Sequence, residues 1–354
     1  MTKRKSTQGH GFGTAPVFLA AISTILGAIL FLRFGYAVAH TGLFGSILII
    51  LIGHAITIPS AMAIAEIATN LKVEGGGEYF IISRSFGSMV GGTIGICLYL
   101  SQAISTAFYM IAFSEAFTPI FGWIQQQMGI IPQTWMISIP VTLLLLVLII
   151  TKGADIGVSA LWVVVMTLAV SLFMFFLGNT SYEPASINIF AKIEAPDNFF
   201  KVFAIIFPAF TGMAAGVGLS GDLKNPRKSI PLGTLSATLT GMVVYVLVVI
   251  KMSHSLSPEE LAADQFAMSK IALWGPIIPI GLGAATLSSA IGSILIAPRT
   301  LQALGGDKIL PLAVINEFLH KGKGKVNEPV NATLVTAIIV LFFVSIGTVD
   351  FVAQ

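Results

Sequence analysis

Long apolar runs separated by short polar segments dominate this sequence. A helix needs roughly 20 residues to cross the hydrocarbon core of a bilayer, which is about 30 Å thick, and nine runs approach or exceed that length. They cover residues 15–39, 43–68, 88–117, 133–151, 155–178, 198–219, 230–253, 267–297 and 329–349. The pattern predicts an all-α, polytopic membrane protein, and the third and eighth runs are long enough to predict tilted helices.

Composition strengthens this prediction. Of the 354 residues, 55% are hydrophobic and 10% are charged, whereas soluble domains carry about 25% charged residues. A net charge of +3 is too small to indicate nucleic acid as a partner, so the lipid bilayer is the expected surrounding. The single cysteine, Cys97, excludes a disulfide within the chain. The first run is too long for the apolar part of a signal peptide, so we expect it to remain as a span.

Lysine and arginine are divided unevenly between the two predicted sides of the membrane. With the N-terminus inside, fourteen fall in cytoplasmic segments: Lys3, Arg4, Lys5, Lys72, Arg84, Lys152, Lys224, Arg227, Lys228, Arg299, Lys308, Lys321, Lys323 and Lys325. Four fall in outer segments: Lys192, Lys201, Lys251 and Lys270. This bias toward the cytoplasm predicts a multi-pass protein of the cell membrane with a cytoplasmic N-terminus.

The sixth run carries residues that a regular helix does not tolerate. Pro208 removes a backbone donor, and Gly212, Gly216 and Gly218 follow it. Freed backbone groups in a membrane must be buried in protein or face a wet cavity. The run therefore predicts two half-helices with a short unwound joint between Pro208 and Gly212. A simple proline kink with glycines at a packed interface is the alternative.

Gly27 lies in the middle of the first run, five runs before Gly212. Two interrupted helices at this separation are what an inverted five-helix repeat places at its central site. The half-helix ends would offer N–H groups to an anion and carbonyls to a cation.

Several polar side chains accompany these breaks. The hydroxyls of Thr286, Ser288 and Ser289 in the eighth run suit a small alkali cation, unless they bond back to their own helix. Arg33 and Glu115 fall within predicted spans, so they would either pair and close the outer mouth or extend to the surface. Neither a metal-ligand cluster nor a nucleophile–base pair stands out, so the sequence predicts no enzyme and no cofactor.

Four stretches in family order resemble the cation–chloride cotransporters of the amino acid–polyamine–cation superfamily. These stretches are Gly27–Arg33, Gly75–Gly95, Phe207–Thr234 and Ala285–Pro311. The resemblance implies a leucine-transporter-like fold. Residues 1–14 would form a cytoplasmic tail, 15–178 the first five-helix repeat, 179–197 an extracellular loop, and 198–354 an incomplete second repeat with spans six to nine.

The same resemblance implies ion sites for this chain. The sodium site would comprise Ser23, Leu26, Ala285, Ser288 and Ser289. The potassium site would comprise Thr24, Ile25, Tyr109, Pro208 and Thr211. Chloride would bind amides of Gly27, Ala28 and Ile29, and a second chloride those of Gly212, Met213 and Ala214. Arg33 and Glu115 would form the extracellular gate.

Two departures from the family matter. Thr24 stands where asparagine is usual, although the family uses a main-chain oxygen there. The chain also stops at Gln354, before the tenth span whose tyrosine would complete the second chloride site, so we expect a truncated or abbreviated member.

The main hypothesis is secondary cotransport of sodium, potassium and chloride by alternating access. The partners would be small inorganic ions, and a homodimer is left open. One alternative is a cation-coupled transporter of amino acids or other organic solutes on the same fold. Another is a channel or a structural membrane partner. Stoichiometry, potassium transport and regulation do not follow from the sequence.

Overall fold

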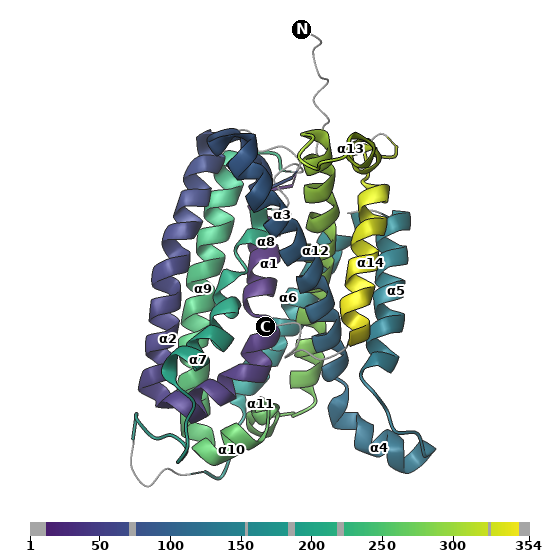
Figure 1. Cartoon of the computed structure of the whole chain (residues 1–354). Helices are drawn as coiled ribbons and strands as arrows, with labels where there is room; N and C mark the ends of the chain where they lie inside the picture. The colour runs from purple at the N-terminus through teal and green to yellow at the C-terminus, as the bar shows by residue number, and fades with distance from the viewer. Residues whose placement is uncertain are drawn as a thin grey trace.

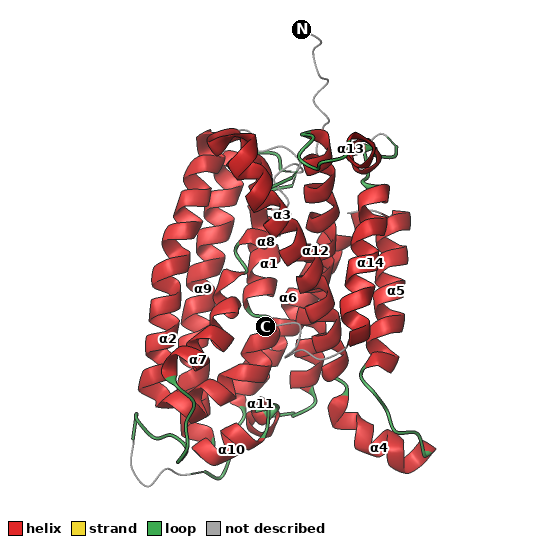
Figure 2. Cartoon of the chain, viewed as in Figure 1, coloured by secondary structure: helices red, strands yellow, loops and turns green. Residues whose placement is uncertain are grey.

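The computed structural model describes residues 12–70, 76–152, 155–182, 188–217, 223–324 and 327–346. Within these ranges the regular elements are helices, joined by loops that contain two isolated β-bridges (Figure 2). The prediction of an all-α membrane protein is confirmed.

Among the described residues, five helical segments are long and apolar enough to cross a membrane. They are α2 (Ala28–Asn70), α3 (Glu78–Glu115), the segment Phe199–Val217, α9 (Pro226–Ser255) and α12 (Ile277–Gly306). Four shorter apolar helices accompany them: α1 (Thr14–Ile25), α5 (Trp135–Lys152), α6 (Asp155–Leu177) and α14 (Val330–Ile346). Large apolar side chains such as Ile338, Val163 and Phe173 are exposed on these helices, as a lipid-facing surface requires.

Two glycines divide the long helices. Gly42 has φ 70° and ψ 177° and divides α2 into the second half of the first predicted span and the whole of the second span. A Cβ atom at Gly42 would lie 3.0 Å from the Ile189 carbonyl oxygen. Gly87, with φ 84° and ψ 171°, separates the first turns of α3 from the third predicted span. Both backbone conformations favour glycine, which has no side chain to clash.

Both ends of the eighth span were predicted in the wrong place. The sequence predicted one helix over 267–297, but α11 (Ala267–Ile271) is separate and α12 begins only at Ile277. Gly275 and Pro276 interrupt the apolar run, because proline fits the start of a helix better than its interior. At the other end α12 continues through Pro298 to Gly306.

The helices pack in pairs that lie far apart in the sequence (Figure 1). The most extensive contacts join α2 to α9 and α3 to α12, and α5 packs against α14. Each pair joins a predicted span to the one five positions later. The main hydrophobic core gathers buried residues of α1, α2, α9 and α12 around the sixth span.

Short helices mark the two ends of the bundle. Figure 1 places α13 (Ala313–His320) at one end, and α4 (Thr118–Met128), α10 (Pro258–Ala263) and α11 at the other.

Candidate functional site

The first predicted break is confirmed at Leu26 and Gly27. Helix α1 ends at Ile25 and α2 begins at Ala28, and the Gly27 N–H donates to the Ile25 carbonyl at 2.8 Å. A Cβ atom at Gly27 would lie 2.7 Å from the Thr24 carbonyl oxygen, closer than such contacts occur. The turn therefore requires glycine.

The second break is longer than the first, and most of it is helical rather than unwound. Helix α7 (Phe199–Ile206) leads into a 3-10 helix, η1 (Phe207–Thr211), and a turn at Gly212 precedes α8 (Ala214–Val217). Pro208 stands in the first turn of η1, where its missing N–H leaves no hydrogen bond unmade. The interruption at Pro208–Gly212 is thus confirmed, with 3-10 winding in place of an unwound joint.

The two breaks meet, although they lie about 185 residues apart. A Cβ atom at Gly212 would come within 2.6 Å of the Ile25 amide nitrogen and 2.9 Å of the Thr24 carbonyl carbon. Only glycine permits this approach of one backbone to the other.

Serine hydroxyls gather beside the first break, as expected for the sodium site. The Ser288 hydroxyl lies 3.2 Å from that of Ser23, and Ala285 and Leu26 are also buried. Ser289 is 2% exposed, and its Oγ has no hydrogen-bond partner among the described residues. This Oγ lies 3.9 Å from the Cβ position of Gly27. A buried hydroxyl without a partner is costly, so this one fits a site built for a ligand.

The residues assigned to potassium lie on the two breaks, except for Tyr109, which is half-buried on α3. Thr24 donates to the Ala20 carbonyl at 3.0 Å, and Thr211 donates to the Pro208 carbonyl at 2.8 Å. These are the hydrogen bonds to the residue's own helix that threonines commonly make. The Ile25 carbonyl accepts from the Gly27 N–H and from the Tyr245 hydroxyl.

The residues assigned to chloride lie at or just before the starts of α2 and α8. Ala28 and Ile29 lie in the first turn of α2, where amides have no partner within the helix. Gly212 and Met213 precede α8, which begins at Ala214. Both sets therefore present N–H groups at a helix start, the arrangement that favours anions.

The extracellular gate stays a prediction. Arg33 Nη1 lies 3.5 Å from Gln265 Oε1, and Glu115 is the last residue of α3.

Sequence reasoning missed Tyr245 on α9. It is fully buried, and its hydroxyl hydrogen-bonds with the Ile25 and Ala209 carbonyls, one on each broken helix. A tyrosine in an apolar run is a weak signal, because a long-range contact of this kind leaves no local pattern.

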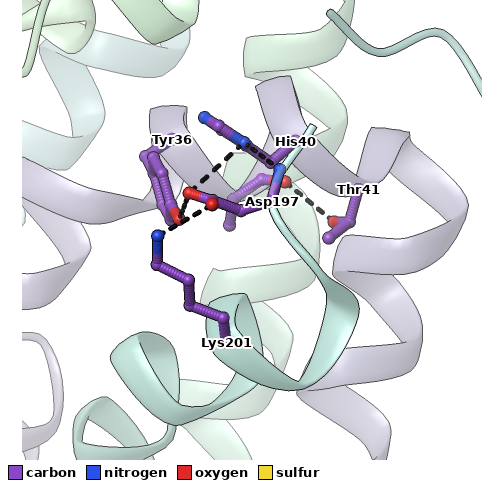
Figure 3. Close-up of polar contacts among 6 residues, drawn as sticks. Tyr36, His40, Thr41, Asp197 and Lys201 are labelled. Atoms are coloured by element: carbon purple, nitrogen blue, oxygen red, sulfur yellow. Dashed lines mark hydrogen bonds and ion pairs between the residues drawn. The ribbon is translucent and has the colours of Figure 1, made fainter. Parts of the chain in front are cut away.

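Sequence reasoning also missed a polar network centred on Asp197 (Figure 3). Its carboxylate accepts hydrogen bonds from Tyr36 at 2.5 Å and Lys201 at 2.7 Å, and its backbone N–H donates to His40 Nδ1 at 2.8 Å. Tyr36 and His40 belong to α2, and Lys201 belongs to α7. The network thus joins α2, which follows the first break, to α7, which precedes the second.

The Asp197 carboxyl is perturbed by its partners. The hydrogen bonds from Lys201 and Tyr36 hold the pKa of Asp197 below its usual value. His40 Nδ1 accepts the Asp197 N–H, so this nitrogen carries no proton in the network.

A second aspartate network joins α3 to the end of α12. Asp307 accepts from Tyr79 at 2.8 Å and binds both terminal nitrogens of Arg84 at 3.1 Å. Burial opposes ionisation of Asp307, but these partners still hold its pKa below the usual value.

Comparison with known proteins agrees with this architecture. The amino acid permease family matches residues 16–351. Solute carrier family 12 member 8 of Mus musculus is 32% identical over 97% of this chain, and member 9 of Danio rerio is 31% identical over 84%. Member 1 of Homo sapiens is 30% identical over 95%. The alignments cover 49%, 38% and 35% of these relatives, so the chain spans about a third to a half of their length.

The family consists of transporters rather than enzymes. The chain forms a bundle of apolar helices with two facing breaks, and the family match covers nearly the whole chain. This chain therefore belongs to the amino acid permease family of multi-pass membrane transporters, as a relative of solute carrier family 12, the cation–chloride cotransporters.

Proposed function

We propose that this protein is a secondary active cotransporter that moves sodium, potassium and chloride together. The observation that carries the proposal is the buried, unpartnered Ser289 hydroxyl beside the break at Gly27. With Ser23 and Ser288 at hand, it offers hard oxygen ligands to a sodium ion. No covalent chemistry is needed, because the ion gradients supply the driving force.

Backbone carbonyls and amides at the two breaks suit the other two ions, potassium and chloride. Carbonyls at the end of α1 suit potassium, and Tyr109 and Thr211 belong to the assigned site. Amides at the starts of α2 and α8 suit chloride. Binding cations and anions at one junction lets their charges offset one another within the low-dielectric interior.

Alternating access would follow from an inverted repeat. Packing of the second, third and fourth predicted spans against the seventh, eighth and ninth supports such a repeat. Rocking of one repeat-related bundle against the other would expose the junction to each side in turn, and the pair of Arg33 and Glu115 would close the outer side.

The proposed orientation keeps the N-terminus cytoplasmic. Arg84 pairs with Asp307, and Lys308 follows Asp307 in the loop between α12 and α13. Arg299 pairs with Glu328 in the loop between α13 and α14, whereas Lys270 lies in α11, which Figure 1 places at the opposite end from α13. The cell membrane and a homodimer are part of the same proposal. Cysteine labelling from either side of intact cells tests the orientation, and cross-linking tests the dimer.

Rubidium uptake into proteoliposomes tests the transport proposal. Uptake should require sodium and chloride outside and should fall to background when either ion is replaced by N-methylglucamine or gluconate. Uptake that is indifferent to both replacements would refute coupled transport of the three ions.

Ser289→Ala tests the sodium site. It should raise the half-saturating sodium concentration by about tenfold, the effect of losing one charge-assisted ligand. Ser293→Ala, a buried serine one turn further along α12, is the matched control and should leave sodium dependence unchanged. Equal effects of the two substitutions would remove Ser289 from the site.

The name of the matched family favours a second candidate, transport of an amino acid. A substrate carboxylate would use the same amides that we assign to chloride. Sodium-dependent uptake of a labelled amino acid without chloride would establish this alternative, whereas conduction at single-channel rates would instead identify a channel.

A further inference from the structure

Tyr245 lies on α9, a helix that contributes no residue to the assigned ion sites. Its ring stacks on Phe34 of α2, with centroids 4.8 Å apart, and meets the edge of Phe210 in η1 at 5.3 Å. The ring therefore packs against an aromatic side chain from each of the two broken helices, which restricts its rotation.

The hydroxyl of this tyrosine reaches the backbone of both breaks. It is hydrogen-bonded to the carbonyl of Ile25, the last residue of α1, and lies 3.0 Å from the carbonyl of Ala209 in η1. A phenol has one proton to donate, so two acceptors must share it. The carbonyls at the end of a helix otherwise lack partners within that helix.

The surface of α9 is shaped for this contact. Gly241 lies one turn before Tyr245, and a Cβ atom there would come within 2.5 Å of the Ile25 side chain. A larger residue would push α9 away from the first break and carry the tyrosine hydroxyl with it.

We propose that Tyr245 is a positioning residue that ties the two breaks together, and that its proton responds to the cation held at Ile25. The second part rests on the proposed function. A cation on the Ile25 carbonyl repels an O–H proton aimed at the same oxygen. The proton then turns to Ala209, and a lone pair of the hydroxyl faces the cation. A cation bound at the first break thereby strengthens the hydrogen bond from Tyr245 to Ala209 at the second break.

Hydrogen–deuterium exchange tests the tie without reference to what is transported. Tyr245→Phe keeps the ring and removes the hydroxyl. In buffer free of sodium and potassium, exchange should rise several-fold in peptides over 22–30 and over 205–215. Tyr99→Phe is the control, because Tyr99 is also buried but its hydroxyl pairs with Thr336 of α14. Unchanged exchange, or a rise at only one break, would overturn the tie.

Gly241→Ala provides a second variant in case Tyr245→Phe does not fold. By displacing Ile25 it should raise exchange at both breaks, and a rise confined to 22–30 would count against the tie.

Rubidium uptake tests the response of the proton. Tyr245→Phe should raise the half-saturating rubidium concentration by about fivefold, the effect of one neutral hydrogen bond, with a maximal rate equal to that of Tyr99→Phe. A lower maximal rate with unchanged half-saturation would overturn the response. If the wild-type protein takes up no rubidium, both the proposed function and the proposed response of the Tyr245 proton are refuted. The exchange measurement still tests whether Tyr245 links the two breaks.

Discussion

Both breaks interrupt a membrane helix, but they involve different numbers of residues. The first occupies Leu26 and Gly27, so the last carbonyls of α1 and the first amides of α2 are only a few residues apart. The second extends from Phe207 to Met213 and is mostly wound as a 3-10 helix. The short break therefore brings backbone groups of both polarities close together, whereas the long one keeps most of its groups within a helix.

This difference assigns distinct roles to the breaks. The first provides a compact junction for ions, with the serines of α12 beside it. The second provides the wall that faces it, since Gly212 approaches the backbone at Thr24 and Ile25. Substitutions at the two glycines should therefore differ in effect.

The largest effect is expected for Gly212→Ala. Its Cβ atom would meet backbone atoms of Thr24 and Ile25 at 2.9 and 2.6 Å, and backbone cannot move aside cheaply. Overpacking costs about 1–3 kcal/mol even where side chains adjust, so we expect initial uptake rates to fall by about 100-fold.

The matched control for this substitution is Gly292→Ala. Gly292 lies within α12 and has open space where a Cβ atom would be placed. Its uptake should match that of the wild type. Similar losses in both variants would mean that the close approach of the two breaks is unimportant.

Gly27→Ala should have a smaller effect, of about tenfold on uptake. Its Cβ atom meets a single carbonyl oxygen, that of Thr24, and a peptide plane can rotate slightly to relieve one contact. Because Ser289 lies next to this position, the half-saturating sodium concentration should rise as well. A loss of rate with unchanged sodium dependence would separate the first break from the sodium site.

The Asp197 network offers a pH test of how the broken helices are joined. In the folded protein His40 Nδ1 accepts the Asp197 N–H, a bond that a protonated imidazole cannot accept, whereas an unfolded histidine has a pKa near 6.5. The unfolded chain therefore binds more protons as the pH falls below about 6.5, and stability is lost in that direction. The melting temperature of the wild type should drop between pH 7.5 and 5.5.

His40→Asn is the comparison for this test. An asparagine oxygen can accept the bond from the Asp197 N–H but does not titrate. Its melting temperature should fall less over the same interval, and parallel curves would show that His40 does not carry the pH dependence.

The smallest effect is expected for Pro208→Ala. Since Pro208 stands in the first turn of η1, alanine would add a donor where none is required. Uptake should stay within about twofold of the wild type, because the 3-10 winding and the turn at Gly212 do not depend on the missing N–H. A large loss would show that proline itself maintains the second break.

Much of the architecture could be predicted from sequence, because the responsible features are local. Apolar runs of bilayer length predicted the spans, and Pro208 with Gly212 predicted the second break. The lone Gly27 was a weaker signal, yet its break is present. The eighth span was predicted wrongly, since apolarity alone does not reveal that Gly275 and Pro276 separate two helices.

By itself the sequence determined the helices, their approximate order and the residue types available to bind ions. Only the tertiary structure decided that Gly212 faces Ile25, that Tyr245 reaches both breaks, and that Asp197 joins α2 to α7. Propensity and periodicity act over a few residues, whereas these contacts join residues up to about 220 positions apart. Their formation depends on how whole helices pack, and no local pattern records that.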